Sequence, residues 1–117
     1  MKASTFSKAM LYYLKWKVQL RRFLDGKGGI SQEEIASPEN CKFGKWLHSE
    51  ELTKCASDLE MREIKNAYSE LHKSANRIYE LKLLGHDNAA RQEFQDMVPM
   101  SMKLVSLLNT MKTLNRN

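Results

Sequence analysis

Three short groups in this 117-residue chain combine side chains that can bind a metal ion or react with an oxidant. They are Tyr13-x-x-Trp16, Cys41-x-Phe43-Gly44-x-Trp46 and Tyr68-x-x-x-His72. A cysteine thiolate and a histidine imidazole are typical ligands of structural zinc, which takes four such donors. A tyrosine phenol, with an ordinary pKa of about 10, must lose its proton before it can compete with them. Cys41 and His72 are therefore candidate metal ligands, whereas Tyr13 and Tyr68 are poor ones.

The same residues also fit a polar cluster in the core that contains no metal. Tyr13 and Tyr68 lie on the apolar rows of their predicted helices, and each hydroxyl can hydrogen-bond to His72 or to the Cys41 thiol. A third interpretation is a redox role for Cys41, which requires an exposed thiol with a lowered pKa. The neighbouring residues are expected to pack in the core around the cluster, with the glycine allowing close helix approach: Trp16, Phe43, Gly44 and Trp46.

The motifs of common enzyme classes are absent from the sequence. It contains no phosphate-binding glycine loop of the Walker or dinucleotide type and no Gly-x-Ser-x-Gly elbow. Its acidic residues fall mainly outside the core rows, so the paired Glu-x-x-His motifs of di-iron bundles are missing as well. We therefore expect a non-catalytic function.

The elements that must position these residues are helices. Apolar residues recur at steps of three and four along three stretches, which is the spacing of one helix face. These stretches run from Phe6 to Phe23, from Met61 to Ile78 and from Ala90 to Met111. A shorter helix is expected around Gly44 and Trp46, and one helical turn between residues 30 and 40.

Local signals mark the ends of these helices. The Ser-Asp pair at 57–58 can cap the second long helix, and Gly85 is expected to end it. Asp87 is expected to cap the last helix. Pro99 lies inside the third apolar row and predicts a kink near Val98.

The length of the chain suits one domain with one core. No internal repeat, low-complexity tract or long linker divides it. Three long amphipathic helices and one short helical segment, with almost no strand-like alternation, predict an all-α fold. We expect an antiparallel four-helix bundle with one short helix, formed as a single domain by residues 1–117.

The distribution of apolar residues argues against a membrane protein. The longest apolar run, at residues 9–14, has six residues, far fewer than the roughly 20 that a membrane-spanning helix needs. The first twenty residues carry four lysines in an amphipathic pattern, which does not resemble a secretory signal. A cytoplasmic location is predicted, where both cysteines would be reduced.

The formal net charge of +5 leaves one further function class open. The densest basic segment contains Lys15, Lys17, Arg21 and Arg22, so the chain could be an adaptor for nucleic acid or anionic lipid. These residues alternate with core apolar positions and match no nucleic-acid motif. A solvated helix face is the simpler interpretation, and nucleic acid is not the expected partner.

The order and separation of the three groups resemble the chemoreceptor zinc-binding domain, a bacterial signalling module. That family carries His-x-x-Trp, then Cys-x-Phe/Leu-Gly-x-Trp, then His-x-x-x-His. Here 24 residues separate Trp16 from Cys41, and 21 separate Trp46 from Tyr68. The resemblance covers about residues 6–110. It implies a sensory or regulatory module of chemotaxis or cyclic-di-GMP-type signalling that acts by binding a ligand or a protein.

The resemblance also implies a set of metal ligands. The family binds one zinc ion with three histidines and one cysteine, whereas this chain has Tyr13 and Tyr68 at two of the four positions. We therefore expect a degenerate site and no required cofactor. The alternative is a functional zinc sensor that uses Cys41, His72 and non-standard ligands. The remaining candidates do not share the register of positions 13 and 68: His48, Cys55 and His86.

Two kinds of protein partner are expected. The family acts in dimeric receptors and cyclases, so the resemblance implies a homodimer and a signalling partner. Several apolar residues lie off the narrow rows and widen the apolar face, as they would if part of it packs on a second copy. These residues are Tyr79, Leu83, Leu84, Met100, Met102 and Leu107.

Overall fold

The computed structural model describes residues 3–28, 31, 42–47 and 57–114. These residues form helices, and no strand occurs among them. The helices are α1 (Ala3–Leu24), α3 (Lys42–Leu47), α5 (Asp58–Leu83), α6 (Asp87–Asp96) and α7 (Val98–Leu114). The predicted all-α fold is confirmed. The helical turn expected between residues 30 and 40 lies outside the described residues.

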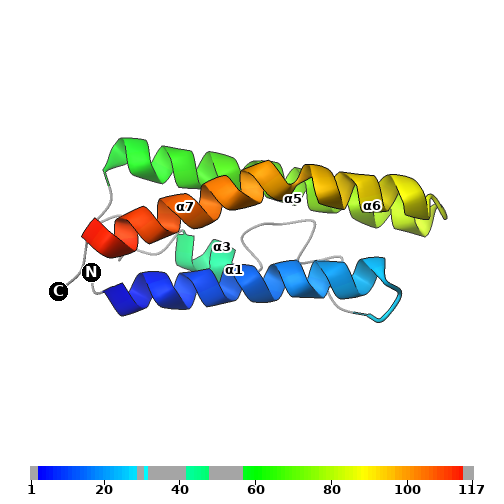
Figure 1. Ribbon diagram of the computed structural model, residues 1–117, viewed down its shortest axis with the longest axis horizontal. Coiled ribbons are helices and arrows are strands. Elements are labelled where there is room, and N and C mark those ends of the chain that lie inside the picture. Colours follow the sequence, from blue (N-terminus) through cyan, green and yellow to red (C-terminus); the bar gives the residue numbers. More distant parts are fainter. Residues whose placement is uncertain (1–2, 29–30, 32–41, 48–56, 115–117) are drawn as a thin grey trace.

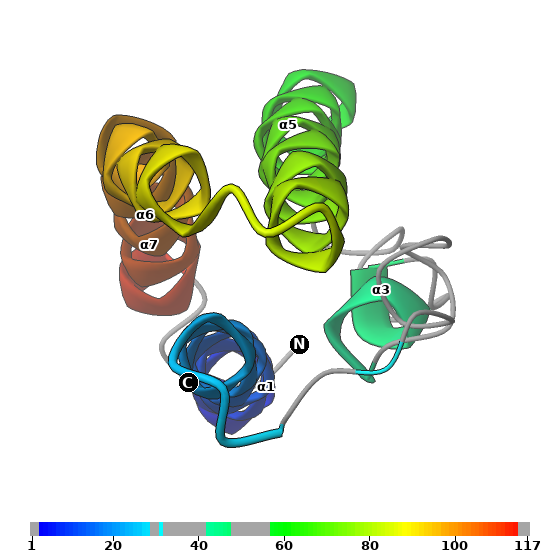
Figure 2. The same ribbon diagram turned by 90° about the vertical axis from the view of Figure 1, so that its right-hand side faces the viewer.

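The helices form an elongated bundle of 47 × 23 × 20 Å. Helices α1 and α5 run in the same direction, and α6 followed by α7 returns in the opposite one (Figure 1). The end view shows α1, α5 and the α6–α7 pair at three corners and the short α3 at the fourth (Figure 2). The structure therefore has the predicted bundle architecture, with one of its four positions filled by the short helix.

Helix α1 buries the apolar row that its sequence predicts. The row runs from Phe6 through Tyr13, Trp16 and Leu20, all of which are buried. Its last member is Leu24 instead of Phe23, which is partly buried and stacks on Tyr79 of α5 at 4.9 Å between ring centroids. The chain then leaves the helix through two glycines with positive φ, Gly26 and Gly28.

Helix α5 is bounded by the signals that the sequence contains. Ser57 is the N-cap: its hydroxyl accepts a hydrogen bond from the Glu60 amide, and the Glu60 carboxylate accepts one from the Ser57 amide. Gly85 follows the helix with φ of 81°, a backbone conformation that favours glycine.

Pro99 divides the last helical segment into α6 and α7, as predicted. Proline has no amide hydrogen and cannot donate to the carbonyl one turn earlier. The break falls at Met97, between the end of α6 and Val98. The prediction that Asp87 caps this segment was wrong by one position, because His86 is the N-cap and makes no side-chain cap bond. Asp87 lies in the first turn and accepts a hydrogen bond from Lys82 at 3.1 Å.

None of the described helices is both long enough and apolar enough to cross a membrane.

Candidate functional site

The candidate site begins with Tyr13, which lies on the core row of α1. Its side chain is buried, and its hydroxyl shares a hydrogen bond with the hydroxyl of Ser101 on α7. Burial raises the pKa of the Tyr13 phenol, and the bond to Ser101 offsets part of that rise. Lys17, one turn after Tyr13, donates from Nζ to the same Ser101 oxygen at 3.3 Å. Ser101 therefore joins a buried tyrosine to a half-buried lysine.

Tyr68 and His72 form the second half of the site on helix α5. They are four positions apart, which places both on the same face of the helix, and both are buried. The Tyr68 hydroxyl and Nε2 of His72 are 2.8 Å apart, and either can donate, according to the tautomer of the imidazole. This contact confirms that a tyrosine hydroxyl pairs with His72.

Aromatic rings bring the two halves together in the core. The Trp16 ring lies 5.1 Å from the imidazole of His72, and the Phe43 ring lies 4.6 Å from that of Tyr68, between centroids. Phe43 also contacts the Tyr13 ring at 6.1 Å. The residues expected to pack in the core are all buried: Trp16, Phe43, Gly44 and Trp46. One from α1 and three from α3 therefore enclose the polar groups.

The two tryptophans carry polar atoms that these contacts leave unsatisfied. Among the described residues, neither the Trp16 Nε1 nor the Trp46 Nε1 has a hydrogen-bond partner, and both atoms are buried. An unpaired buried donor costs about 1–3 kcal/mol. The cluster is thus stabilised mainly by ring packing, and its hydrogen bonds are concentrated on the tyrosines.

The partner of Tyr13 differs from the prediction. The hydroxyl was expected to bond to His72 or Cys41, but its observed partner is Ser101, which is 88 residues away in sequence. Ser101 occupies a buried position between Met97 and Leu104 on α7. A serine inside an otherwise apolar row was the available signal, because a buried hydroxyl requires a partner.

Several predicted candidates do not enter the described site. Cys41, His48 and Cys55 lie outside the described residues. His86 is exposed at the start of α6.

The basic segment of α1 does not form one open patch. Lys17 is engaged by Ser101, and Arg21 pairs with Asp25 at 3.2 Å. The pKa of Asp25 is lowered mainly by the hydrogen bond that Arg91 of α6 donates and, to a smaller extent, by the contacts with Arg21. Arg22 donates to the backbone carbonyl of Lys27. These contacts support the interpretation of a solvated helix face.

The fold and the cluster define a small helical-bundle domain with a polar, aromatic-lined core. A comparison with protein families matches residues 14–79 to the chemoreceptor zinc-binding domain. The match spans more than half of the chain and includes Trp16, the Cys41 segment, Tyr68 and His72, and it begins one residue after Tyr13. This chain belongs to that family. No curated protein and no solved structure matches the chain.

Zinc is the metal that the family description implies, and the described residues do not fit it. Tyr13 is bonded to Ser101, and its raised pKa keeps the proton on the phenol. The Tyr68 hydroxyl lies against Nε2 of His72. Within the described ranges, no group of three or more His, Cys, Asp or Glu side chains could hold a metal ion. We derive no chemistry through zinc from this arrangement.

Proposed function

We propose that this chain is a non-catalytic sensory or regulatory module of chemotaxis or cyclic-di-GMP-type signalling. In this proposal, hydrogen bonds between side chains take the place of the zinc site. The observation that carries it is the pairing of Tyr13 with Ser101 and of Tyr68 with His72. Both tyrosines are buried, and each hydroxyl has a side-chain hydrogen-bond partner without an ion.

This replacement changes what the core can respond to. The bond from Tyr13 joins α1 to α7, and the bond between Tyr68 and His72 stays within α5. Because neither bond needs an ion, the packing of the helices depends on the chain alone. A signal would then enter through a ligand or protein bound elsewhere on the bundle and favour one helix arrangement over another.

A second candidate is a functional zinc sensor that uses Cys41, His72 and non-standard ligands. Two observations favour it. His72 is buried in the core, and Phe43, two residues after Cys41, contacts the Tyr68 ring beside the histidine. Zinc binding through Nε2 of His72 would displace the Tyr68 hydroxyl from that atom.

Metal analysis of purified, tag-free protein distinguishes the two candidates. Elemental mass spectrometry is applied to the wild type, to a Tyr13→His/Tyr68→His double variant and to the same variant with Cys41→Ala. We expect little zinc in the wild type after zinc addition at neutral pH. We expect about one zinc per chain in the double variant, because it provides three imidazoles and one thiolate, and loss of that zinc on Cys41→Ala.

Two results would contradict the proposal. Near-stoichiometric zinc in the wild type, lost in both Cys41→Ala and His72→Ala, would make the chain a metal sensor with unusual ligands. A correctly folded double variant that binds no zinc would show that positions 13 and 68 do not correspond to metal-ligand positions.

The predicted homodimer stays a prediction, and of the six residues behind it three are exposed and three pack partly against the core. Leu83 and Leu84 are exposed at the end of α5, and Met102 lies on α7. The other three pack partly against the core: Tyr79, Met100 and Leu107. Sedimentation equilibrium tests it, since the mass of one chain is 13.6 kDa and a dimer has twice that mass.

A further inference from the structure

Helices α1 and α7 carry most of the exposed large apolar side chains. Of the eight such side chains in the described part of the chain, five lie on these helices. On α1 they are spaced by three and four residues and so form one row, and on α7 they lie one turn apart. They are Leu11, Leu14 and Val18 on α1 and Val98 and Met102 on α7. An exposed apolar group of this kind marks an interaction surface.

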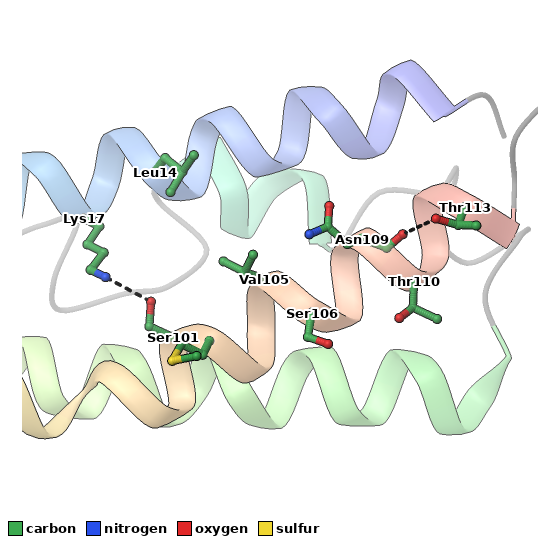
Figure 3. Close-up of a pocket in the computed structure, with 9 residues that line it drawn as sticks. Leu14, Lys17, Ser101, Val105, Ser106, Asn109, Thr110 and Thr113 are labelled. Atoms are coloured by element: carbon green, nitrogen blue, oxygen red, sulfur yellow. Dashed lines mark hydrogen bonds between the residues drawn. The ribbon is translucent and has the colours of Figure 1, made fainter.

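A groove lies between the two helices at this surface. It has a volume of about 510 Å³, and Leu14 and Lys17 of α1 line it (Figure 3). Helix α7 lines it from Ser101 to Thr113, with Met102 and Val105 among the lining residues. Twelve helical steps span roughly 18 Å, or a little over three helical turns. The groove therefore has the length of a short helix.

The two helices that border the groove carry charge of one sign. Helices α1 and α7 contain seven of the nineteen Lys and Arg residues and none of the fourteen Asp and Glu residues. They carry a formal charge of +7, and the rest of the chain carries −2. The basic residues are Lys8, Lys15, Lys17, Arg21, Arg22, Lys103 and Lys112. Two copies that met through this face would bring like charges together, whereas an acidic partner would neutralise them.

Lys17 is the cationic side chain that lines the groove. In the part of the chain that the structure describes, Lys17 at the groove is paired with the Ser101 hydroxyl and with no carboxylate.

We propose that the groove between α1 and α7 binds an acidic amphipathic helix of a partner protein. Its apolar side chains would contact Leu14, Met102 and Val105, and a carboxylate would pair with Lys17, the cationic side chain among those that line the groove. A nucleic acid does not account for the exposed apolar row, and a flat membrane surface does not fill a groove. The inference rests on the proposed regulatory function, because the groove would be the site at which a partner acts on the module.

The test uses two synthetic peptides of about 18 residues with leucines at the same helical spacing. One carries glutamate at the flanking positions and the other lysine. Binding is measured by fluorescence anisotropy with wild type, with Leu14→Ser/Met102→Ser and with Lys17→Glu. The matched control is Leu59→Ser on α5, because Leu59 is 63% exposed and Met102 is 67% exposed. Circular dichroism establishes that each variant is folded.

We expect the acidic peptide to bind at least tenfold more tightly than the basic one, with affinity that falls as salt is raised. Both groove variants should weaken binding about tenfold or more, and the Leu59→Ser control should not. Equal binding of the two peptides, or unchanged binding by the folded groove variants, would overturn the proposal.

Other occupants of the face give different results, and each would overturn it. A wild-type dimer that dissociates in Leu14→Ser/Met102→Ser identifies a second copy. Binding to phosphatidylglycerol vesicles or to duplex DNA, with no binding of the acidic peptide, identifies a membrane or a nucleic acid. Zinc content is a separate readout, so a metal-loaded wild type would contradict the proposed function without affecting the peptide result.

Discussion

The hydroxyl of Ser101 connects the core of the bundle to its surface. It is bonded on one side to the buried phenol of Tyr13 and on the other to Lys17, which lines the groove between α1 and α7. A partner that drew Lys17 toward a carboxylate would remove one of the two bonds of Ser101. The two hydrogen bonds of Ser101 thus connect the proposed docking surface to Tyr13 in the aromatic cluster.

Substitutions at Tyr13 and Ser101 should have unequal costs. Tyr13→Phe leaves Ser101 with Lys17 as a donor, so we expect a loss of about 1 kcal/mol in the free energy of unfolding at neutral pH. Ser101→Ala leaves the buried Tyr13 hydroxyl without its observed partner, and we expect about 1–3 kcal/mol. Urea denaturation of both variants measures the difference. A smaller cost for Ser101→Ala than for Tyr13→Phe would contradict this account.

The raised pKa of Tyr13 predicts a loss of stability in base. The folded state holds the phenol proton more tightly than the unfolded state, whose pKa is the ordinary value of 10.0. The contribution of the Tyr13 phenol to the free energy of unfolding is therefore complete below pH 10. It is lost as the pH rises from there through the folded pKa. Urea denaturation between about pH 9 and 11 should show a shallower decline for Tyr13→Phe than for wild type. Identical slopes would show that Tyr13 is not protected.

At the scale of the helices, stability depends on the local signals that bound them. The Ser57–Glu60 capping box satisfies two backbone donors at the start of α5, and Gly85 allows the left-handed turn that follows the helix. Pro99 separates α6 from α7 because its ring removes one backbone donor. These features act over a few residues, so their effects can be predicted one at a time.

Removing the cap of α5 should destabilise the protein modestly. Ser57→Ala deletes the oxygen that accepts from the Glu60 amide, and we expect a loss of about 1 kcal/mol. Ser57→Asp keeps an acceptor at the N-cap and is the control, for which we expect little change. Thermal denaturation followed by circular dichroism compares the three proteins. Equal melting temperatures for wild type and Ser57→Ala would show that the cap contributes nothing.

Gly85 tests backbone strain without a steric clash. A Cβ added at this position would meet no atom within 4 Å, but φ is 81°. Gly85→Ala should therefore cost about 1–2 kcal/mol through strain alone. Gly85→Asn should cost less, because asparagine tolerates this region better. A loss of several kcal/mol, measured by urea denaturation, would indicate a packing role that the open surroundings do not support.

At the scale of the whole molecule, one core unites all the long helices. Buried residues of α1, α5 and α7 belong to a single apolar cluster, together with those of α3. A bundle of this kind is expected to unfold cooperatively. Both tryptophans lie inside this core, so their fluorescence reports on it directly.

A cavity in this core should weaken the whole bundle. Leu71 is fully buried on α5, and Leu71→Ala should cost about 2–5 kcal/mol. Leu83→Ala, at a side chain that is 67% exposed, is the matched control and should change stability by about 0.5 kcal/mol or less. Circular dichroism and tryptophan fluorescence should give coincident denaturation curves. Separate transitions would show that the helices do not share one cooperative core.

Several features of the fold and the candidate site could be predicted from the sequence because their causes are local. The spacing of three and four places Tyr13 and Trp16 on the buried face of α1 and Tyr68 and His72 on that of α5. The bond between Tyr68 and His72 follows from four residues of separation on one helix. The capping serine, the ending glycine and the break before Pro99 are equally short-range.

By itself, the sequence determined the helical class, most of the helix ends and most of the side chains in the core, because periodicity and capping act within one or two turns. Only the tertiary structure decided which groups meet across the bundle. Ser101 pairs with Tyr13 across 88 residues, and Met102 lies at the groove while Met100 packs against the core. These outcomes depend on how α7 is rotated against α1 and α5, which is set by the packing of all the helices together.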